Sequence, residues 1–271
     1  MLIAQLTDLH IKKAGKHAYK KVDTLACLEK AISHINALVP CPDLVVITGD
    51  LGDFGTIDEY ELISKALYKF TMPVHIVPGN HDNRDNLRQV LGEMTSFDHA
   101  QYCNFVVDHP DQVLIGLDSS VIGESHGYLS EETLFWLNKT LEIHKQKSVM
   151  LFIHHPPMPV GLGHMDVQNL HNAGDLYDIL KRFDNVNGLV AGHLHRPISA
   201  LWNKIPVWVG PSHSHSVTLD LKPEADSSFS LEPAAIRLFI LDQDTVISHL
   251  SYIDHSDGPY PFFDQLGNLI D

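Results

Sequence analysis

The sequence predicts an α/β fold, and three observations support that prediction. Short apolar runs typical of buried strands alternate with stretches of helical periodicity up to about residue 195. The chain has 271 residues, 44% of them hydrophobic, which suffices for the core of one large domain. After about residue 197 the helical periodicity stops, and short strand-like runs joined by tight turns follow. We therefore expect a single domain over 1–271, a strand-rich sub-region at 197–250 suited to dimer formation, and an aromatic tail at 251–271.

Each expected element rests on its own local pattern. Before residue 197, strands are expected at Leu2–Leu6, Asp43–Ile47, Val74–Val77, Tyr102–Val107, Val113–Asp118, Val149–Ile153 and Gly188–Val190. Helices are expected at Tyr19–Leu38, Asp58–Phe70, Asn83–Leu91 and Asp175–Phe183, and another after Ser130, whose hydroxyl suits an N-cap. Later strands are expected at Ile198–Trp202, Ile205–Val209, Ser216–Leu219, Ala235–Leu241 and Thr245–Leu250. The strand–helix–strand order predicts a parallel sheet with helices on its face, and the tail should pack onto the domain or another subunit.

The composition argues against several kinds of partner. A net charge of −15, with histidine neutral, disfavours a nucleic acid duplex, because phosphate backbones are bound through clustered Lys and Arg. Three widely spaced cysteines without a CxxC pair indicate a reducing compartment and not a disulfide scaffold. The N-terminus has no basic leader, and no apolar stretch approaches the ~20 residues that span a bilayer. We therefore expect a cytoplasmic protein with no membrane partner.

Side chains that bind metals follow five of the predicted strands. They are Asp8 and His10, Asp50, Asn80 and His81, His154, and His193 with His195. The ends of neighbouring parallel strands lie ~4.8 Å apart, so these side chains can converge at the edge where ligands of open α/β sheets bind. A lone histidine is more often structural than a ligand, and Asp50 by itself also suits a turn. Five such blocks together instead predict a site for two divalent cations that share a carboxylate.

These blocks also carry a resemblance to a known family. The series Asp8-x-His10, Gly49-Asp50, Gly79-Asn80-His81-Asp82, His154 and Gly192-His193-x-His195 resembles the calcineurin-like metallophosphoesterases. Phrases such as His154-His155-Pro156-Pro157 make it most similar to the bacterial glycerophosphodiesterase and class III cyclic-nucleotide phosphodiesterase group. The resemblance runs from Leu2 to about Leu250. It implies a four-layer αββα sandwich of the metallophosphoesterase type, with the second sheet drawn partly from the strand-rich region after His195.

The resemblance implies a role for each site residue. Asp8, His10 and His195 would hold one metal ion, Asn80, His154 and His193 the other, and Asp50 would bridge both. The ions would be divalent or of mixed valence, with Fe, Mn, Zn and Co all compatible with these ligands. Asp50 and His81 are the expected catalytic residues, and Asn80, His81 and His213 the expected substrate contacts, with His215 a further candidate.

We expect a phosphodiesterase that acts on small diesters, either cyclic nucleotides such as 3',5'-cAMP or glycerophosphodiesters, by attack of a metal-bound hydroxide on phosphorus. A phosphomonoesterase is disfavoured because Phe54 stands where phosphoprotein phosphatases of this family carry a phosphate-clamping Arg. Arg196 is a candidate substitute, although a surface role suits it better. A nuclease on the same core is disfavoured by the charge, and a non-catalytic scaffold by the complete ligand set. Relatives assemble into dimers or larger oligomers, so a homo-oligomer is a further expectation.

Overall fold

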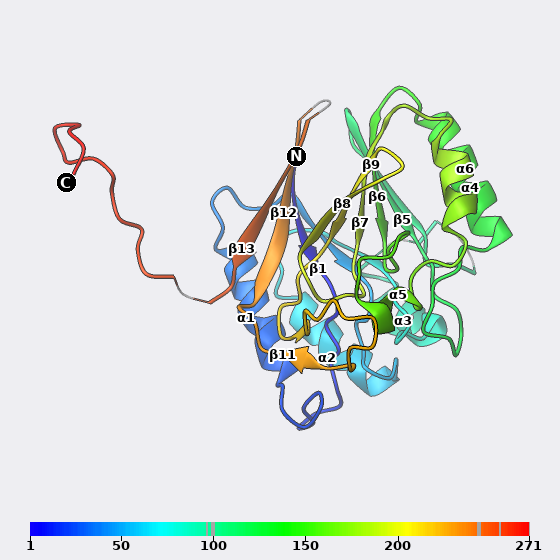
Figure 1. Cartoon of the computed structure of the whole chain (residues 1–271), viewed down its shortest axis with the longest axis horizontal. Helices are drawn as coiled ribbons and strands as arrows, with labels where there is room; N and C mark the ends of the chain where they lie inside the picture. The colour runs from blue at the N-terminus through cyan, green and yellow to red at the C-terminus, as the bar shows by residue number, and fades with distance from the viewer. Residues whose placement is uncertain (96, 99–100, 243–244, 255, 271) are drawn as a thin grey trace.

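Two β-sheets packed face to face form the centre of the structure, a computed structural model that describes residues 1–95, 97–98, 101–242, 245–254 and 256–270 (Figure 1). The first sheet has the strand order β13-β12-β1-β2-β3. Its strands are β1 (Leu2–Leu6), β2 (Leu44–Thr48), β3 (Val74–Val77), β12 (Ala235–Asp242) and β13 (Thr245–Tyr252). β1, β2 and β3 are parallel, as expected, while β12 runs antiparallel to β1.

The second sheet has the strand order β4-β5-β6-β7-β9-β8. Its strands are β4 (Phe105–Asp108), β5 (Gln112–Leu117), β6 (Ser148–Ile153), β7 (Val186–Ala191), β8 (Ile198–Trp202) and β9 (Ile205–Val209). A separate short ribbon pairs β10 (Ser216–Val217) with β11 (Phe229–Ser230). The region after residue 197 was expected to contribute to the second sheet, and β8 and β9 confirm this. β12 and β13 instead complete the first sheet, so this region contributes to both.

Helices cover the outer faces of both sheets (Figure 1). Those on the first sheet are α1 (Thr24–Asn36), α2 (Ile57–Leu67) and α3 (Arg84–Leu91), and those on the second are α4 (Glu131–Ile143) and α6 (Ala173–Leu180). α5 (Gly163–Asp166) is one turn in the loop before α6. No helix among these described residues is long and apolar enough to cross a bilayer.

Three apolar clusters separate the four layers and explain the alternation of side chains along each strand. In β1, Ala4 and Leu6 belong to the cluster under α1 and α2, whereas Ile3 belongs to the cluster between the two sheets. A third cluster lies between the second sheet and α4 and α6, and includes Leu137 and Leu151. Because both faces of the central strands are buried, these strands appear in the sequence as continuous apolar runs. The predicted four-layer sandwich is confirmed.

The boundaries of the elements differ from the prediction in a few places. The first helix begins at Thr24 and not at Tyr19, because Tyr19 and Lys20 have φ angles of 50° and 58°, which a right-handed helix does not allow. Asp23 caps that helix by accepting from Ala26 N at 3.1 Å. α5 and β11 were not expected, since four and two residues are too few to give a periodic signal.

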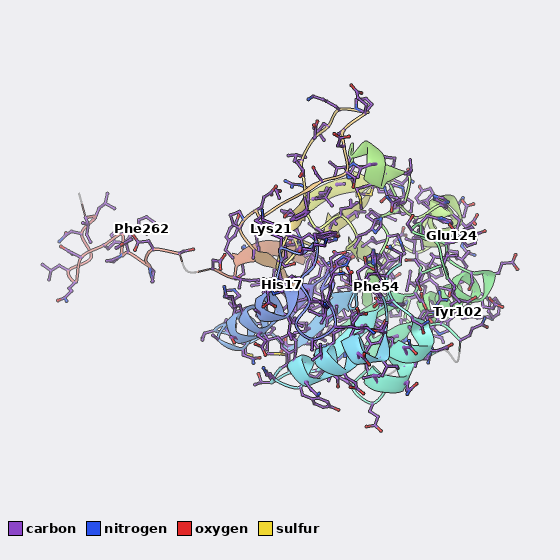
Figure 2. The ribbon with its side chains drawn as sticks, turned by 90° about the horizontal axis from the view of Figure 1, so that it is seen from below. His17, Lys21, Phe54, Tyr102, Glu124 and Phe262 are labelled. Carbon is purple, nitrogen blue, oxygen red and sulfur yellow. The ribbon has the colours of Figure 1, made fainter. Side chains whose placement is uncertain are left out.

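Beyond β13 the chain leaves the body of the molecule and extends away from it (Figures 1 and 2). Within the predicted tail, the described residues 256–270 extend away from the body, whereas Ser251 and Tyr252 complete β13 and Ile253 packs against the cluster under α1 and α2. Positions 255 and 271 of that range lie outside the described residues.

Candidate metal centre

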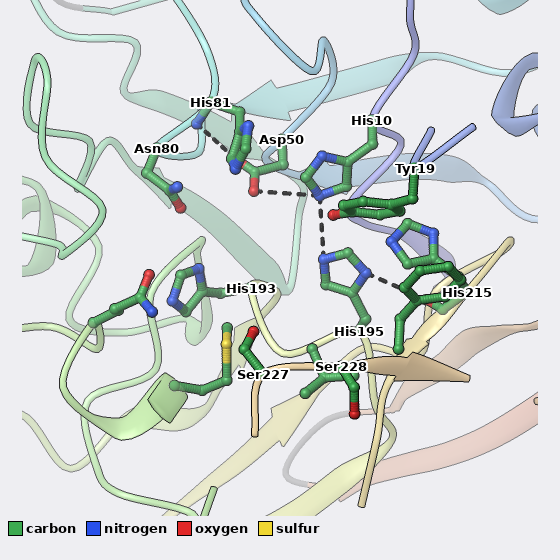
Figure 3. A pocket seen from close by; sticks show the side chains of 14 residues that line it. His10, Tyr19, Asp50, Asn80, His81, His193, His195, His215, Ser227 and Ser228 are labelled. Carbon is green, nitrogen blue, oxygen red and sulfur yellow. Dashed lines mark hydrogen bonds and ion pairs between the residues drawn. The ribbon is translucent and has the colours of Figure 1, made fainter. Parts of the chain in front are cut away.

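The five predicted blocks meet at one end of the two sheets. Asp8 and His10 follow β1, Asp50 follows β2, and Asn80 and His81 follow β3, all in the first sheet. His154 follows β6, and His193 and His195 follow β7, in the second sheet. The two sheets thus contribute facing halves of one site at the carboxyl ends of their parallel strands (Figure 3).

The backbone of these loops turns sharply where the ligand side chains arise. Asp8, His10, Asp50, His193 and His195 all have φ between 46° and 72°, in the left-handed region that non-glycine residues seldom occupy. Each such residue costs of the order of 1–3 kcal/mol and persists only where surrounding contacts enforce it. Here backbone bonds between the loops enforce it, since Asp8 N donates to Gly49 O at 3.0 Å and His10 N to Asp50 O at 2.9 Å.

The first half of the centre brings together Asp8, His10 and His195. The Nε2 atoms of His10 and His195 lie 3.1 Å apart, and His195 Nε2 lies 3.5 Å from Asp8 Oδ1. Asp50 Oδ2 borders this group, 3.6 Å from His10 Nε2. All four residues are buried, with at most 6% of their surface exposed.

The second half brings together Asn80, His154 and His193. His154 Nε2 lies 3.2 Å from Asn80 Oδ1, 3.2 Å from His193 Nδ1 and 3.4 Å from Asp50 Oδ2. The same Asp50 oxygen therefore faces both halves.

The hydrogen bonds of the histidine rings indicate which ring nitrogens are available to bind cations. Each of three histidines uses Nδ1–H to donate to an oxygen: His10 to Asp53 Oδ1 (3.1 Å), His154 to Thr48 O (2.7 Å) and His195 to His215 O (3.2 Å). When these rings are neutral, their Nε2 atoms therefore present lone pairs to one another and to carboxylate and amide oxygens. Such a convergence of acceptors is electrostatically unfavourable unless positive charge lies among them, so the residues fit a pair of metal ions.

The pKa values of the buried groups agree with the need for positive charge among these side chains. Burial alone would lower the pKa of His154, yet the Asp50 carboxylate outweighs it and raises that pKa to about 9. Burial would likewise raise the pKa of Asp50, but His154 and His81 hold it well below its usual value. Burial also holds the pKa values of His193 and His195 well below normal, which keeps both rings neutral as ligands.

His81 stands at the rim and contacts the centre through its backbone. Its amide N donates to Asp50 Oδ1 at 2.9 Å, and its ring Nδ1–H donates to Asp53 O at 2.8 Å. The ring therefore has Nε2 left for a ligand in the cavity. Asp82 fixes the loop beneath it, accepting from Gly79 N at 2.9 Å and from the Tyr60 hydroxyl at 2.9 Å.

A cavity of about 550 Å³ opens over the centre (Figure 3). Beside ligand residues it is lined by Tyr19, Met165, Gln168, His215, Val217, Ser227, Ser228 and Phe229. Tyr19 stacks on Phe229 with ring centroids 4.8 Å apart, and His215 packs edge-on against Tyr19 at 5.3 Å. Sequence reasoning missed Tyr19 and Phe229, because their contact joins segments about 210 residues apart and neither belongs to a motif.

The structure separates His213 from this cavity. His213 is 1% exposed, and its Nε2–H donates at 3.3 Å to the carbonyl oxygen of Thr24, the first residue of α1. His215, two residues later, lines the cavity. Ser212 Oγ accepts from the amides of Ser214 (3.2 Å) and His215 (3.4 Å), and this tight turn directs the two rings apart.

A smaller cavity of about 300 Å³ lies on the other side of His81. It shares Asn80 and His81 with the larger one and is also lined by Phe54, Arg84 and Ile122. The Arg84 guanidinium is already paired with Asp118, Nε to Oδ2 at 2.5 Å.

Comparison with known proteins agrees with this geometry. A family model described as calcineurin-like phosphoesterase matches residues 1–197. A protein of Arcobacter nitrofigilis named "probable glycerophosphodiester phosphodiesterase GpdQ" is 44% identical over 273 residues, covering 100% of both chains. The "3',5'-cyclic adenosine monophosphate phosphodiesterase CpdA" of Escherichia coli K12 is 30% identical over 233 residues, covering 86% of this chain and 82% of that protein. The crystal structure of a dimetal phosphatase from Danio rerio has the same fold, with a TM-score of 0.67, 15% identity and coverage of 94% and 96%.

Proposed function

Because the chain belongs to the calcineurin-like phosphoesterase family, we propose that it hydrolyses small phosphodiesters at a centre of two metal ions. The single observation that supports this most is the convergence of six acceptor side chains from two sheets around the Asp50 carboxylate.

The residues divide between two ions. Asp8, His10 and His195 would hold one, and Asn80, His154 and His193 the other, with Asp50 common to both; Fe, Mn, Zn and Co all suit this ligand set. When bound, such ions acidify a water molecule and neutralise the charge of phosphoryl oxygens. They would supply the positive field that a chain of net charge −15 otherwise lacks.

His81 is the group of this chain best placed to handle a proton. Its Nδ1–H is engaged by Asp53 O at 2.8 Å, which orients the ring and directs Nε2 toward the ligand space. A proton held at Nε2 can pass to the departing alcohol oxygen, and proton transfer by a positioned histidine contributes ~10²–10⁴-fold to rate. Asp50 positions His81 by accepting from its backbone N.

Diesters suit the cavity better than monoesters do. Among the described residues no Lys or Arg side chain lines the larger cavity, so a dianionic monoester would lack the bidentate clamp it benefits from. Phe54 is 70% exposed at the neighbouring rim. Arg196, the candidate substitute, instead donates to Val217 O at 2.7 Å and Glu232 Oε1 at 2.6 Å.

Two cavities that meet at Asn80 and His81 favour an acyclic diester over a cyclic one. An acyclic diester has two separate arms, and cavities of about 550 and 300 Å³ can each take one of them. A cyclic nucleotide carries both ester oxygens on one ring and needs only the larger space. We therefore place glycerophosphodiesters, the substrates named for the Arcobacter relative, ahead of cyclic AMP, named for the Escherichia relative.

The test uses protein loaded with Mn²⁺, assayed with bis(p-nitrophenyl) phosphate and then with a glycerophosphodiester and cyclic AMP. We expect hydrolysis that requires metal, and a kcat/KM at least tenfold higher for the glycerophosphodiester. His81→Ala should retain both ions and lose ~10²-fold or more in kcat, while His109→Ala, an exposed histidine remote from the centre, should match the parent. A loaded protein that hydrolyses none of the three would indicate a scaffold, and a preference for cyclic AMP would refute the two-arm assignment.

A further inference from the structure

Lys12 and Asp53 form an ion pair beside the first half of the metal centre, and both lie outside the set of expected ligands. Asp53 Oδ1 accepts from His10 Nδ1–H at 3.1 Å, while Asp53 Oδ2 accepts from Lys12 Nζ. The side chains of Lys12 and Asp53 are 17% and 10% exposed, so solvent screens this pair far less than a surface pair. The neighbouring pair of Lys13 with Asp58 is, by contrast, 54% and 70% exposed.

Asp53 is the partner that sets the direction of a ligand ring. A metal-binding histidine that donates its second ring N–H to a carboxylate is fixed in tautomer and orientation and becomes a stronger ligand. The hydrogen bond from His10 Nδ1 to Asp53 has this form, and it leaves His10 Nε2 facing the Asp50 carboxylate at 3.6 Å.

The backbone of Asp53 also connects the two loops that carry the first half of the centre. Its amide N donates to Ile11 O at 3.0 Å, and its carbonyl O accepts from His81 Nδ1–H at 2.8 Å. The rings of His10 and His81 meet edge-on, with centroids 4.8 Å apart. A displacement of Asp53 therefore disturbs the expected ligand His10 through the side chain and His81 through the carbonyl oxygen.

Lys12 is the contact that holds the Asp53 carboxylate in one orientation. A single hydrogen bond to His10 would leave the carboxylate free to turn about its Cβ–Cγ bond, because this torsion has broad minima. The lysine binds the other carboxylate oxygen and removes that freedom. Lys12 is itself restrained, since its Nζ lies 4.4 Å from the centroid of the Phe54 ring, which attracts a cation over its face.

We propose that Lys12 is a positioning residue of the metal centre, which holds the Asp53 carboxylate where it directs His10 Nε2 toward the first metal ion. This role rests on the proposed function, because it requires His10 to bind a cation. The two effects of the lysine have opposite signs. Its positive charge alone repels a cation, so loss of the charge would tighten metal binding, whereas loss of the positioning would weaken it.

The test is a chelator-buffered titration of Mn²⁺ into the metal-free, full-length protein. We expect Lys12→Met to bind one of the two ions about 3–10-fold more weakly, which is less than the ~10–100-fold loss expected when a direct partner of a ligand is removed. Lys12→Arg can still pair with a carboxylate and should restore the wild-type affinity to within about twofold. Lys13→Met removes the exposed neighbouring lysine and is the matched control, which should bind both ions as the wild type does.

A double-mutant cycle shows whether the lysine acts through Asp53. In the Asp53→Asn background, Lys12→Met should weaken Mn²⁺ binding no further, because the group that it positions is already lost. Circular dichroism of the metal-free proteins establishes that each variant is folded. If Lys12→Met does not fold, Lys12→Gln provides the same comparison, with a smaller loss expected because the amide can still donate to the carboxylate.

A Lys12→Met protein that binds Mn²⁺ as tightly as the wild type, or more tightly, would overturn the proposal. Equal weakening with and without the Asp53 carboxylate would overturn it as well, since the lysine would then act by another route. A wild type that binds no Mn²⁺ would refute the metal centre and the proposed function together. A wild type that binds two ions beside an unchanged Lys12→Met would refute the role of the lysine alone.

Discussion

Gly79→Ala is the sharpest perturbation of the metal centre that changes no ligand. A Cβ at residue 79 would lie 2.2 Å from Asp50 Oδ1 and 2.5 Å from Asp50 N. Ordinary contacts of a Cβ begin near 3.4 Å, so the bridging carboxylate would have to retreat by about 1 Å. Because the nearest atoms include backbone, a simple rotation of the side chain cannot relieve the clash.

The expected damage depends on the contacts that Asp50 makes. Its Oδ1 accepts from His81 N, and its Oδ2 faces His10 and His154, so a displacement disturbs both halves of the centre together. A misplacement of ~1 Å in a catalytic constellation can cost ~10² in rate. We therefore expect Gly79→Ala to bind less than two equivalents of metal, measured by elemental analysis, and to lose about 10²-fold in kcat/KM toward bis(p-nitrophenyl) phosphate.

The matched control is Gly174→Ala in α6, where an added Cβ meets nothing within 4 Å. Alanine is the better helix former by roughly 0.5–1 kcal/mol, so this variant should be as active as the parent and slightly more stable. If Gly79→Ala retained full metal occupancy and a kcat/KM within threefold of the parent, the inference that Asp50 couples both halves would be refuted.

Three further outcomes are expected. Burial lowers the pKa of His213 to about 4, so protonation of this ring favours the unfolded chain. The free energy of unfolding is therefore unaffected by this ring above pH 6.5 and falls as the pH drops toward 4. At pH 4.5 the loss is about 2.5 kcal/mol. Urea unfolding of His213→Gln at pH 7 and 4.5 should show a smaller acid loss by that amount, and an equal loss would contradict the burial argument. Asp53→Asn removes the carboxylate that orients His10, so chelator-buffered titration should show ~10–100-fold weaker binding of one ion, whereas exposed Asp58→Asn should bind as the parent does. Removal of the ions with EDTA should lower the unfolding midpoint, since metal at 100 times its Kd stabilises by about 2.7 kcal/mol per site, and coincident melts with and without chelator would argue against a metal centre.

Local sequence was sufficient to predict which side chains the structure brings together at the ends of the strands. Each ligand block directly follows a buried apolar run, and both the end of a strand and the two-residue spacing of Asp8/His10 and His193/His195 can be recognised without tertiary contacts. Such a mixture of carboxylate, imidazole and amide ligands is suited to divalent cations. The parallel order of β1, β2 and β3 could also be predicted, because helical connections between consecutive strands allow little else.

Only the tertiary structure decided what surrounds the centre. β12 pairs with β1 across more than 230 residues, and no local pattern specifies that partner. Tyr19 and Phe229 meet over the cavity for the same reason, and the turn at Ser212 selects His215 over His213 through one side-chain oxygen. The left-handed backbone of the ligand loops also depends on hydrogen bonds between loops from different strands. Periodicity reports which face of an element is buried, whereas contacts between distant loops depend on how whole layers pack against one another.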